Sequence, residues 1–156
     1  MMDIRTLDQG DVIELSRLVG EVANYHHEID PVYKSHNQYS GLKEMVEGWL
    51  TDADTLVLLA EENKKLIGYI RIGVEPAPEY STEKKIGMVY DAFIEEESRR
   101  QGIAELLFQR SLEWFAKKGV ENIELNVDAR NSGAIEFWRQ LDFADYKIRM
   151  RRPLDL

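Results

Sequence analysis

Residues 90–107 read YDAFIEEESRRQGIAELL, and this stretch decides the fold. It begins inside IGMVYDAFI (86–94), a run rich in β-branched and aromatic residues that predicts a strand. It ends in ELLFQRSLEWF (105–115), where apolar residues recur at helical spacing. Between the two elements lies RRQGIA (99–104), so Gly102 falls at a strand-to-helix junction.

RRQGIA has the chemistry of an anion site. A glycine lets the backbone approach a ligand without a Cβ in the way. The first turn of a helix exposes unpaired N–H groups at the positive end of its dipole, where phosphate groups bind. Arg99 and Arg100 would add charge-assisted hydrogen bonds. The hexapeptide alone equally fits a turn with two solvated arginines. It matches neither a GxxxxGK[ST] nor a GxGxxG nucleotide loop.

Working outward, alternating and helical patterns predict the other elements. The order is βαα, then three strands, then αβαβ, which predicts a mixed α/β domain with helices covering a sheet. With 156 residues, we expect one domain over 1–156. The expected strands are DIRTL (3–7), the hairpin TLVLLAEENKKLIGYIRIGV (55–74), IGMVYDAFI, NIELNVD (122–128) and FADYKIRMRR (143–152). The expected helices run from Val12 to about Tyr25, from Leu42 to Leu50, through ELLFQRSLEWF and from Asn131 through Leu141.

Composition narrows the classes of function. Acidic residues outnumber basic ones by 29 to 20, for a formal charge of −9. This balance argues against a nucleic-acid surface and favours cationic small molecules or basic peptides as partners. The chain has no cysteine, which excludes disulfides and a cysteine nucleophile. The longest purely aliphatic run is LVLLA (56–60), so we expect no export signal, no membrane span and a cytoplasmic location.

Three segments in register resemble one family. Arg99, Gly102 and Ala104 form the Arg-x-x-Gly-x-Ala pattern, which is similar to the pyrophosphate-binding signature of the GNAT superfamily of N-acetyltransferases. NVDARNSGAIEFWRQLDF (126–143) resembles the second signature of that superfamily, and DIRTLDQGDVIELSRL (3–18) resembles its first strand and helix.

The resemblance implies a fold and a reaction. It implies a largely antiparallel sheet of six to seven strands with about four helices and a splayed strand at the cofactor site. It implies acetyl-CoA as co-substrate, no metal, and acetyl transfer to a primary amine of a small molecule or peptide by direct attack. The alternative is a non-catalytic acyl-CoA-binding module. Family members often form homodimers, so a dimer in which residues 147–154 add an edge strand is an alternative to a monomer.

The resemblance also implies positions for the cofactor. Backbone groups of Ala92, Phe93 and Ile94 would meet the pantetheine arm and the thioester carbonyl, with the Ala92 N–H as oxyanion donor. Asn131 would contact the cofactor from the second signature, and Trp138 would pack against the cofactor or the core. The pyrophosphate would lie on the segment Arg99, Arg100, Gln101, Gly102, Ile103 and Ala104.

The residues for proton transfer are less marked. The tyrosine that serves as acid in many family members is replaced here by Trp138, whose indole N–H supplies no proton at neutral pH. Tyr90 and Tyr146 are the candidate acids, and each could equally be a packing aromatic. Asp91, expected on the opposite strand face from Tyr90, and Glu95 are the nearest carboxylates for a base. A water relay is the alternative.

YHHEID (25–30) is a third candidate segment. Adjacent histidines point to different helix faces and HExxH is absent, so we expect no metal site. The segment resembles the acceptor-lining helix and loop of the superfamily, which implies substrate roles for His26, His27, Asp30 and Tyr33. Ordinary surface roles are the alternative. Glu95, in the acidic run 95–97, belongs either to a solvated loop or to a surface that attracts a cationic acceptor.

Overall fold

The structure is a computed structural model that describes residues 1–155. The described residues divide into two compact units, residues 1–126 and a second unit that begins at Val127. The first unit carries the sheet and the strand-to-helix junction of RRQGIA, and the second carries the last helix.

The first unit is built on a five-stranded sheet with the strands in sequence order. The first four strands pair antiparallel and the fifth pairs parallel to the fourth. The predicted hairpin is confirmed, because β2 and β3 are joined at Asn63 and Lys64, both of which have a positive φ. The strands are β1 (Met2–Thr6), β2 (Thr55–Glu62), β3 (Lys65–Pro76), β4 (Lys85–Ile94) and β5 (Ile123–Leu125).

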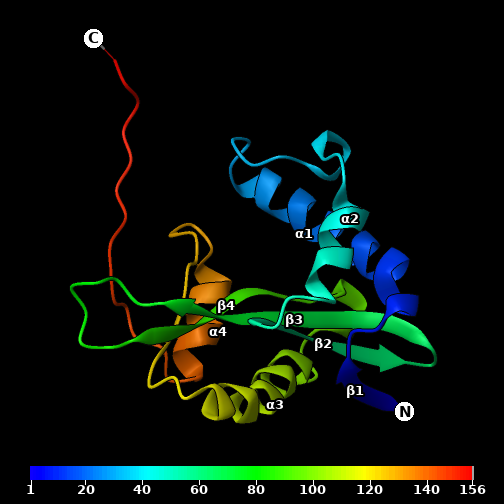
Figure 1. The fold of residues 1–156 in the computed structure, drawn as a ribbon. Helices are drawn as coiled ribbons and strands as arrows, with labels where there is room; N and C mark the ends of the chain where they lie inside the picture. The colour runs from blue at the N-terminus through cyan, green and yellow to red at the C-terminus, as the bar shows by residue number, and fades with distance from the viewer. Residues whose placement is uncertain (156) are drawn as a thin grey trace. The chain divides into compact units, whose positions relative to one another are not determined.

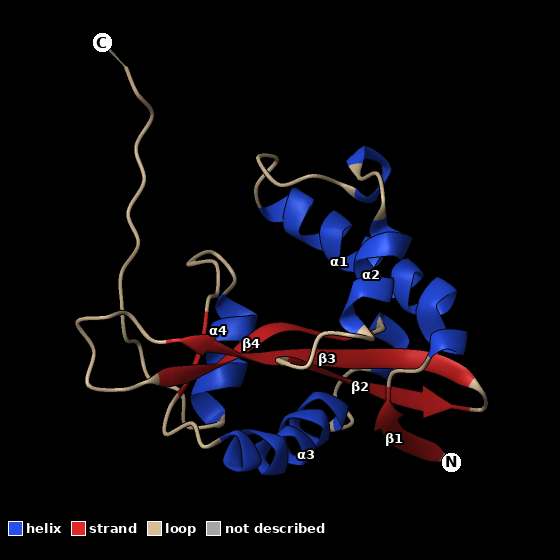
Figure 2. Ribbon diagram, in the orientation of Figure 1, coloured by secondary structure: helices blue, strands red, loops and turns tan. Residues whose placement is uncertain are grey.

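Helices cover both faces of this sheet. Helices α1 (Val12–Ile29) and α2 (Leu42–Trp49) lie on one face, and α3 (Ile103–Lys118) lies on the other (Figure 1). Short 3-10 turns at Gln9–Asp11, His36–Gln38 and Glu96–Ser98 join the elements (Figure 2). None of the helices between residues 1 and 155 is long and apolar enough to cross a lipid bilayer.

Each face has its own apolar packing. On the face of α1 and α2, Leu15, Leu18 and Val46 pack with Leu59 and Tyr69 of the sheet. The opposite side chains of β3, Ile70 and Ile72, are fully buried, as are Leu107 and Phe115 of α3. This alternation along β3 follows from the period of two in a strand. The core fixes the sheet between the two layers of helices.

Strand β4 contains a bulge and then separates from β5. Asp91 pairs with Arg71 and Val89 pairs with Ile72, so Tyr90 is the extra residue of the bulge. Strand β5 pairs with β4 at Gly87, Met88 and Val89 alone. Residues 91–94 therefore pair with β3 on one side and, among the strands that the structure describes, have a free edge on the other. The expected splayed strand is confirmed.

The second unit contains α4 (Ser132–Gln140) and an extended segment. The expectation of six to seven strands is wrong in number, because FADYKIRMRR (143–152) forms no strand. The strand expected at NIELNVD is present but shorter, at Ile123–Leu125. A strand forms when its backbone pairs with a neighbour. The side chains of Tyr146, Ile148 and Met150 are 71–89% exposed. Helix α1 also runs four residues past the expected Tyr25, to Ile29, and Pro31 follows it.

Candidate functional site

The first half of the candidate site is the open N-terminus of α3. Gly102 is the N-cap residue with φ +75°, and Arg100 has φ +64°. The first N–H that bonds within the helix at this end is that of Leu106, to the Gly102 carbonyl at 3.0 Å. The N–H groups of Ile103 and Ala104 therefore have no intrahelical partner. A Cβ added to Gly102 would meet nothing within 4 Å, so the space over this helix end is open.

The second half is the free edge of β4. The Glu95 N–H donates to the Ile67 carbonyl at 2.8 Å, so this backbone N–H points toward β3. Backbone N–H groups alternate in direction along an antiparallel strand. Ala92 and Ile94 therefore direct their N–H groups to the free edge, while those of Phe93 and Asp91 face β3. Ala92 is exposed, and the backbone of Phe93 is engaged with β3 instead of lying at the edge as expected.

Arg99 connects these two halves. Its Nε donates to the Ile94 carbonyl at 2.8 Å, and its guanidinium lies 5.6 Å from the centroid of the Phe93 ring. The Nε of Arg99 is thus committed to the end of β4 and holds the 95–102 loop against the strand. Arg100 and Gln101 are exposed. The backbone, more than the Arg99 charge, presents the donors at this end of α3.

Glu95 is buried and paired, so the reading of 95–97 as a solvated loop is wrong for this residue. Its side chain is 10% exposed and forms ion pairs with Arg17 at 2.9 Å and Lys65 at 3.0 Å. Burial raises the pKa of Glu95, but the hydrogen bonds from Lys65 and Arg17 outweigh burial and lower it below its usual 4.5. Because two cations neutralise it, this carboxylate anchors the loop instead of attracting an acceptor.

Replacing Glu95 by glutamine is expected to lower the free energy of unfolding at pH 7 by about 1–3 kcal/mol. This is less than for a fully buried pair, since both partner cations are partly exposed. Because the pKa of Glu95 is lower in the folded than in the unfolded protein, its ion pairs stabilise the fold fully above the unfolded value of 4.5. This stabilisation is lost as the pH falls through the pKa of the folded protein. Urea unfolding should therefore show a smaller difference at pH 3.5 than at pH 7, with the exposed Glu96→Gln as control. An equal difference at both pH values would contradict the pairing.

The bulge brings Tyr90 and Asp91 to one guanidinium. Arg71 bonds Asp91 Oδ2 through Nε at 3.0 Å, and its Cζ lies 4.4 Å from the centroid of the Tyr90 ring. The expectation that these two side chains lie on opposite faces is therefore wrong, because the extra residue interrupts the alternation.

The hydroxyl of Tyr90, one of the two candidate acids, is already engaged with another side chain. Its hydroxyl donates to Glu75 Oε1 at 2.8 Å. Burial, followed by this hydrogen bond, raises the pKa of Tyr90 to about 12. The hydroxyl is therefore protonated at neutral pH and directed at Glu75.

The residues expected to line the acceptor pocket from YHHEID lie together at the end of α1. The His26 and Tyr33 rings are in edge contact at 6.4 Å, and His27 Nδ1 lies 2.7 Å from the Tyr33 carbonyl. Asp30 accepts a hydrogen bond from the Val32 N–H at 3.1 Å. The structure thus brings these four residues into one local group. No cluster of three or more His, Cys, Asp or Glu suited to a metal occurs within residues 1–155.

The remaining candidates belong to the second unit. Asn131 caps α4, its Oδ1 accepting a hydrogen bond from the Ala134 N–H at 3.2 Å. Trp138 is buried, with ring contacts to Phe137 at 4.9 Å and Phe143 at 5.4 Å. Tyr146 is 71% exposed. Within its own unit, Trp138 is a packing residue.

Arg71, Trp49 and Glu75 are site candidates that the sequence reasoning missed. The signal available was Arg71 itself, the single charged residue within the otherwise apolar LIGYIRIGV (66–74). Its partners come from another helix and across a bulge, which no sequence pattern shows.

Comparison with known proteins identifies the family of the chain. A sequence model described as "Acetyltransferase (GNAT) family" matches residues 21–143. The chain belongs to the GNAT family. The match includes the free edge of β4, the N-terminus of α3 and α4. The resemblance seen in RRQGIA and its neighbours is confirmed.

Curated relatives of this GNAT protein are acetyltransferases. Mycothiol acetyltransferase of Renibacterium salmoninarum is 29% identical over 103 residues, which make up 66% of this chain and 30% of that protein. N-acetyltransferase 8 of Homo sapiens is 22% identical over 102 residues, 65% of this chain and 44% of that protein. The alignments therefore span less than half the length of these relatives.

Solved structures share the fold. A mutant of the BH1408 protein from Bacillus halodurans has a TM-score of 0.86 at 25% identity, covering 97% of this chain and 99% of that chain. The aminoglycoside N-acetyltransferase AAC(6')-Iy in complex with CoA has a TM-score of 0.76 at 15% identity, covering 99% and 96%.

Proposed function

We propose that this GNAT protein is an acetyl-CoA-dependent N-acetyltransferase that acts on a primary amine, with residues 1–156 working as one domain. The observation that carries the proposal is the free edge of β4 beside the open N-terminus of α3. The family match, which spans parts of both units, and the CoA complex of a structural neighbour support it.

The backbone fits the shape of the co-substrate. The N–H groups of Ile103 and Ala104 would hold the pyrophosphate, at the end of α3 where the dipole is positive. The edge of β4 would pair with the amide groups of the pantetheine arm, as an added strand pairs with a sheet edge. The N–H of Ala92 would donate to the thioester oxygen, on which negative charge develops during attack.

The transfer is a direct displacement. Acetyl-CoA supplies an activated acetyl group as a thioester. The lone pair of the neutral amine forms the new C–N bond, the C–S bond breaks, and the sulfur leaves with its electron pair. The amine nitrogen loses one proton and the CoA sulfur gains one, so the step is balanced. The chain has no cysteine to carry the acetyl group, which supports attack without an acyl-enzyme.

Water is our proposed route for these protons. Asp91 is paired with Arg71, and the Tyr90 hydroxyl donates to Glu75, so both candidates on β4 are engaged. Desolvation of a bound amine lowers its pKa, and a water relay is then a sufficient base. Tyr146 remains a proposed acid, with its side chain largely exposed.

Because the side chains of Asp91 and Tyr90 are bonded to other residues, a second candidate function is a non-catalytic acyl-CoA-binding module. Two measurements separate the candidates. Calorimetry with acetyl-CoA should show binding in both cases. In an assay over a broad panel of primary amines, free thiol should be released if the protein is an enzyme and should not be released if it is a non-catalytic module. Binding without thiol release on any amine would favour the module, and absence of binding would contradict both.

A further inference from the structure

Arg71 lies in an unusual setting on the face of α1 and α2. Its Cζ is 4.6 Å from the centroid of the Trp49 ring and 4.4 Å from that of the Tyr90 ring. Its Nε is bonded to Asp91. Three neighbours from α2 and β4 therefore hold one guanidinium, and such stacking fixes the plane of the group.

The outer end of this guanidinium is available. Neither Nη atom of Arg71 has a hydrogen-bond acceptor among the residues that the structure describes, and the side chain is 22% exposed. A planar guanidinium with two parallel N–H groups matches the two oxygens of a carboxylate. The held group thus offers a fork that a ligand can reach.

The fork lies close to the proposed site of transfer. Arg71 pairs with Asp91, and the neighbouring pair is Ile70 with Ala92, whose N–H faces the free edge. The side chain of Arg71 stacks on Trp49 of α2 and so lies on the α1 and α2 face. Helix α3, which would hold the pyrophosphate, covers the other face of the sheet (Figure 1). An acceptor on this face would approach the acetyl group from the side opposite the pyrophosphate.

A second unpartnered donor lies two residues away on the same face. Tyr69 is fully buried, and its hydroxyl has no hydrogen-bond partner within the described part of the chain. Burial, and then the charge of Asp91, raise the pKa of Tyr69 well above its usual 10.0, so it remains a neutral donor. A buried hydroxyl without a partner is costly, which marks it as a group that a ligand could satisfy.

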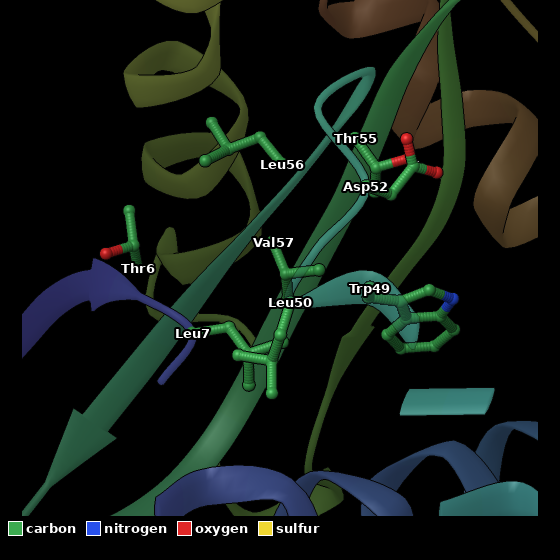
Figure 3. Close-up of a pocket in the computed structure, with 8 residues that line it drawn as sticks. All are labelled: Thr6, Leu7, Trp49, Leu50, Asp52, Thr55, Leu56 and Val57. Carbon is green, nitrogen blue, oxygen red and sulfur yellow. The ribbon is translucent and has the colours of Figure 1, made fainter. Parts of the chain in front are cut away.

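Acidic groups contact Arg71 or act on its neighbour Tyr90, and they limit what can bind. Asp91 is bonded to Arg71, and Glu75 accepts a hydrogen bond from the Tyr90 hydroxyl. Burial raises the pKa of Tyr90 most, followed by Glu75, and the negative charge of Asp52 adds to the effect. Trp49 and Asp52 also line a small hollow at the α2–β2 connection, with Thr55 and five other residues (Figure 3). These carboxylates would repel a simple anion and suit an ammonium group. The surroundings therefore favour a ligand that carries both charges.

We propose that Arg71 binds a carboxylate of the acceptor, so that the acceptor is an amino acid or peptide bearing its amine near that carboxylate. This inference rests on the proposed acetyl transfer and names the class of its acceptor. It differs from the purely cationic acceptor that the net charge favours.

Matched pairs of acceptors test the proposal. L-amino acids and the corresponding L-amino acid amides form pairs of similar size, one member with the carboxylate and one without it. The amides have the lower amine pKa, which works against the expected preference. Spermidine and phosphoethanolamine represent a polycation and a phosphate-bearing amine. With acetyl-CoA and a thiol-release assay, the carboxylate forms should be preferred by at least about tenfold in kcat/KM. Arg71→Gln should remove this preference mainly by raising KM, and Arg71→Lys should restore it in part. The exposed Arg110→Gln is the control.

A binding measurement covers the case in which no amine of the panel reacts. Saturation-transfer NMR with CoA present should show contact with N-acetylglycine, weaker contact with N-acetylglycinamide, and loss of the difference in Arg71→Gln. Thermal unfolding of the variant checks that it is folded. The proposal would be overturned if amino acids and their amides gave equal kcat/KM values or equal NMR contact, or if spermidine or phosphoethanolamine were preferred. If the unmodified protein does not bind CoA, the result instead contradicts the proposed function.

Discussion

Replacing Gly102 by glutamate is expected to weaken acetyl-CoA binding at least about 100-fold, or about 2.7 kcal/mol. The new carboxylate would lie at the N-terminus of α3, where the N–H groups of Ile103 and Ala104 are proposed to hold the pyrophosphate. Like charges forced together cost several kcal/mol. Calorimetric titration with acetyl-CoA measures the change directly.

Gly102→Gln is the matched control, because it has the same size and meets the same positive φ without the charge. The backbone strain of a non-glycine residue costs about 1–2 kcal/mol in both variants. An acidic residue at a helix N-terminus offsets part of that cost, so Gly102→Glu should fold at least as well as Gly102→Gln. Gly102→Gln should bind acetyl-CoA a few-fold more weakly than the unmodified protein does. Equal affinities of the two variants would mean that no anion is held at this end of α3.

Replacing Ala92 by proline is expected to lower kcat by about 100- to 1000-fold with little change in acetyl-CoA affinity. Proline removes one backbone N–H, which is proposed to stabilise the charge on the thioester oxygen. The position tolerates proline in the sheet, because the Ala92 N–H faces the free edge instead of β3. Thiol release with an amine that the unmodified protein acetylates gives kcat.

Ala92→Ser keeps the N–H and is the control for changes in the side chain, which is exposed. It should retain most of the activity. If serine and proline lowered kcat equally, the backbone donor would have no part in the transfer.

The β4–α3 junction could be predicted from the sequence because its determinants are local. A β-rich run, a glycine and an amphipathic helix lie within one segment, and the free N–H groups follow from helix geometry. The strand predicted at 143–152 shows the limit of this reasoning. Alternating side chains indicate which residues would share a face, but the pattern is silent on whether a backbone partner exists.

The interior of the site could not be predicted, because it depends on contacts between distant segments. The burial of Glu95 is set by Arg17 and Lys65, which come from α1 and β3. The shared contact of Tyr90 and Asp91 with Arg71 requires a bulge, and a period of two places them apart. Charge patterns in the sequence thus located acidic residues without showing which are neutralised.

Incubation of the protein with a cell extract and acetyl-CoA carrying a ¹³C-labelled acetyl group tests the central claim most directly. Mass spectrometry should reveal at least one amine that gains a labelled acetyl group, with one free CoA formed for each product. Acetyl-CoA that binds and is recovered intact, with no labelled amine above a Gly102→Glu control, would contradict acetyl transfer.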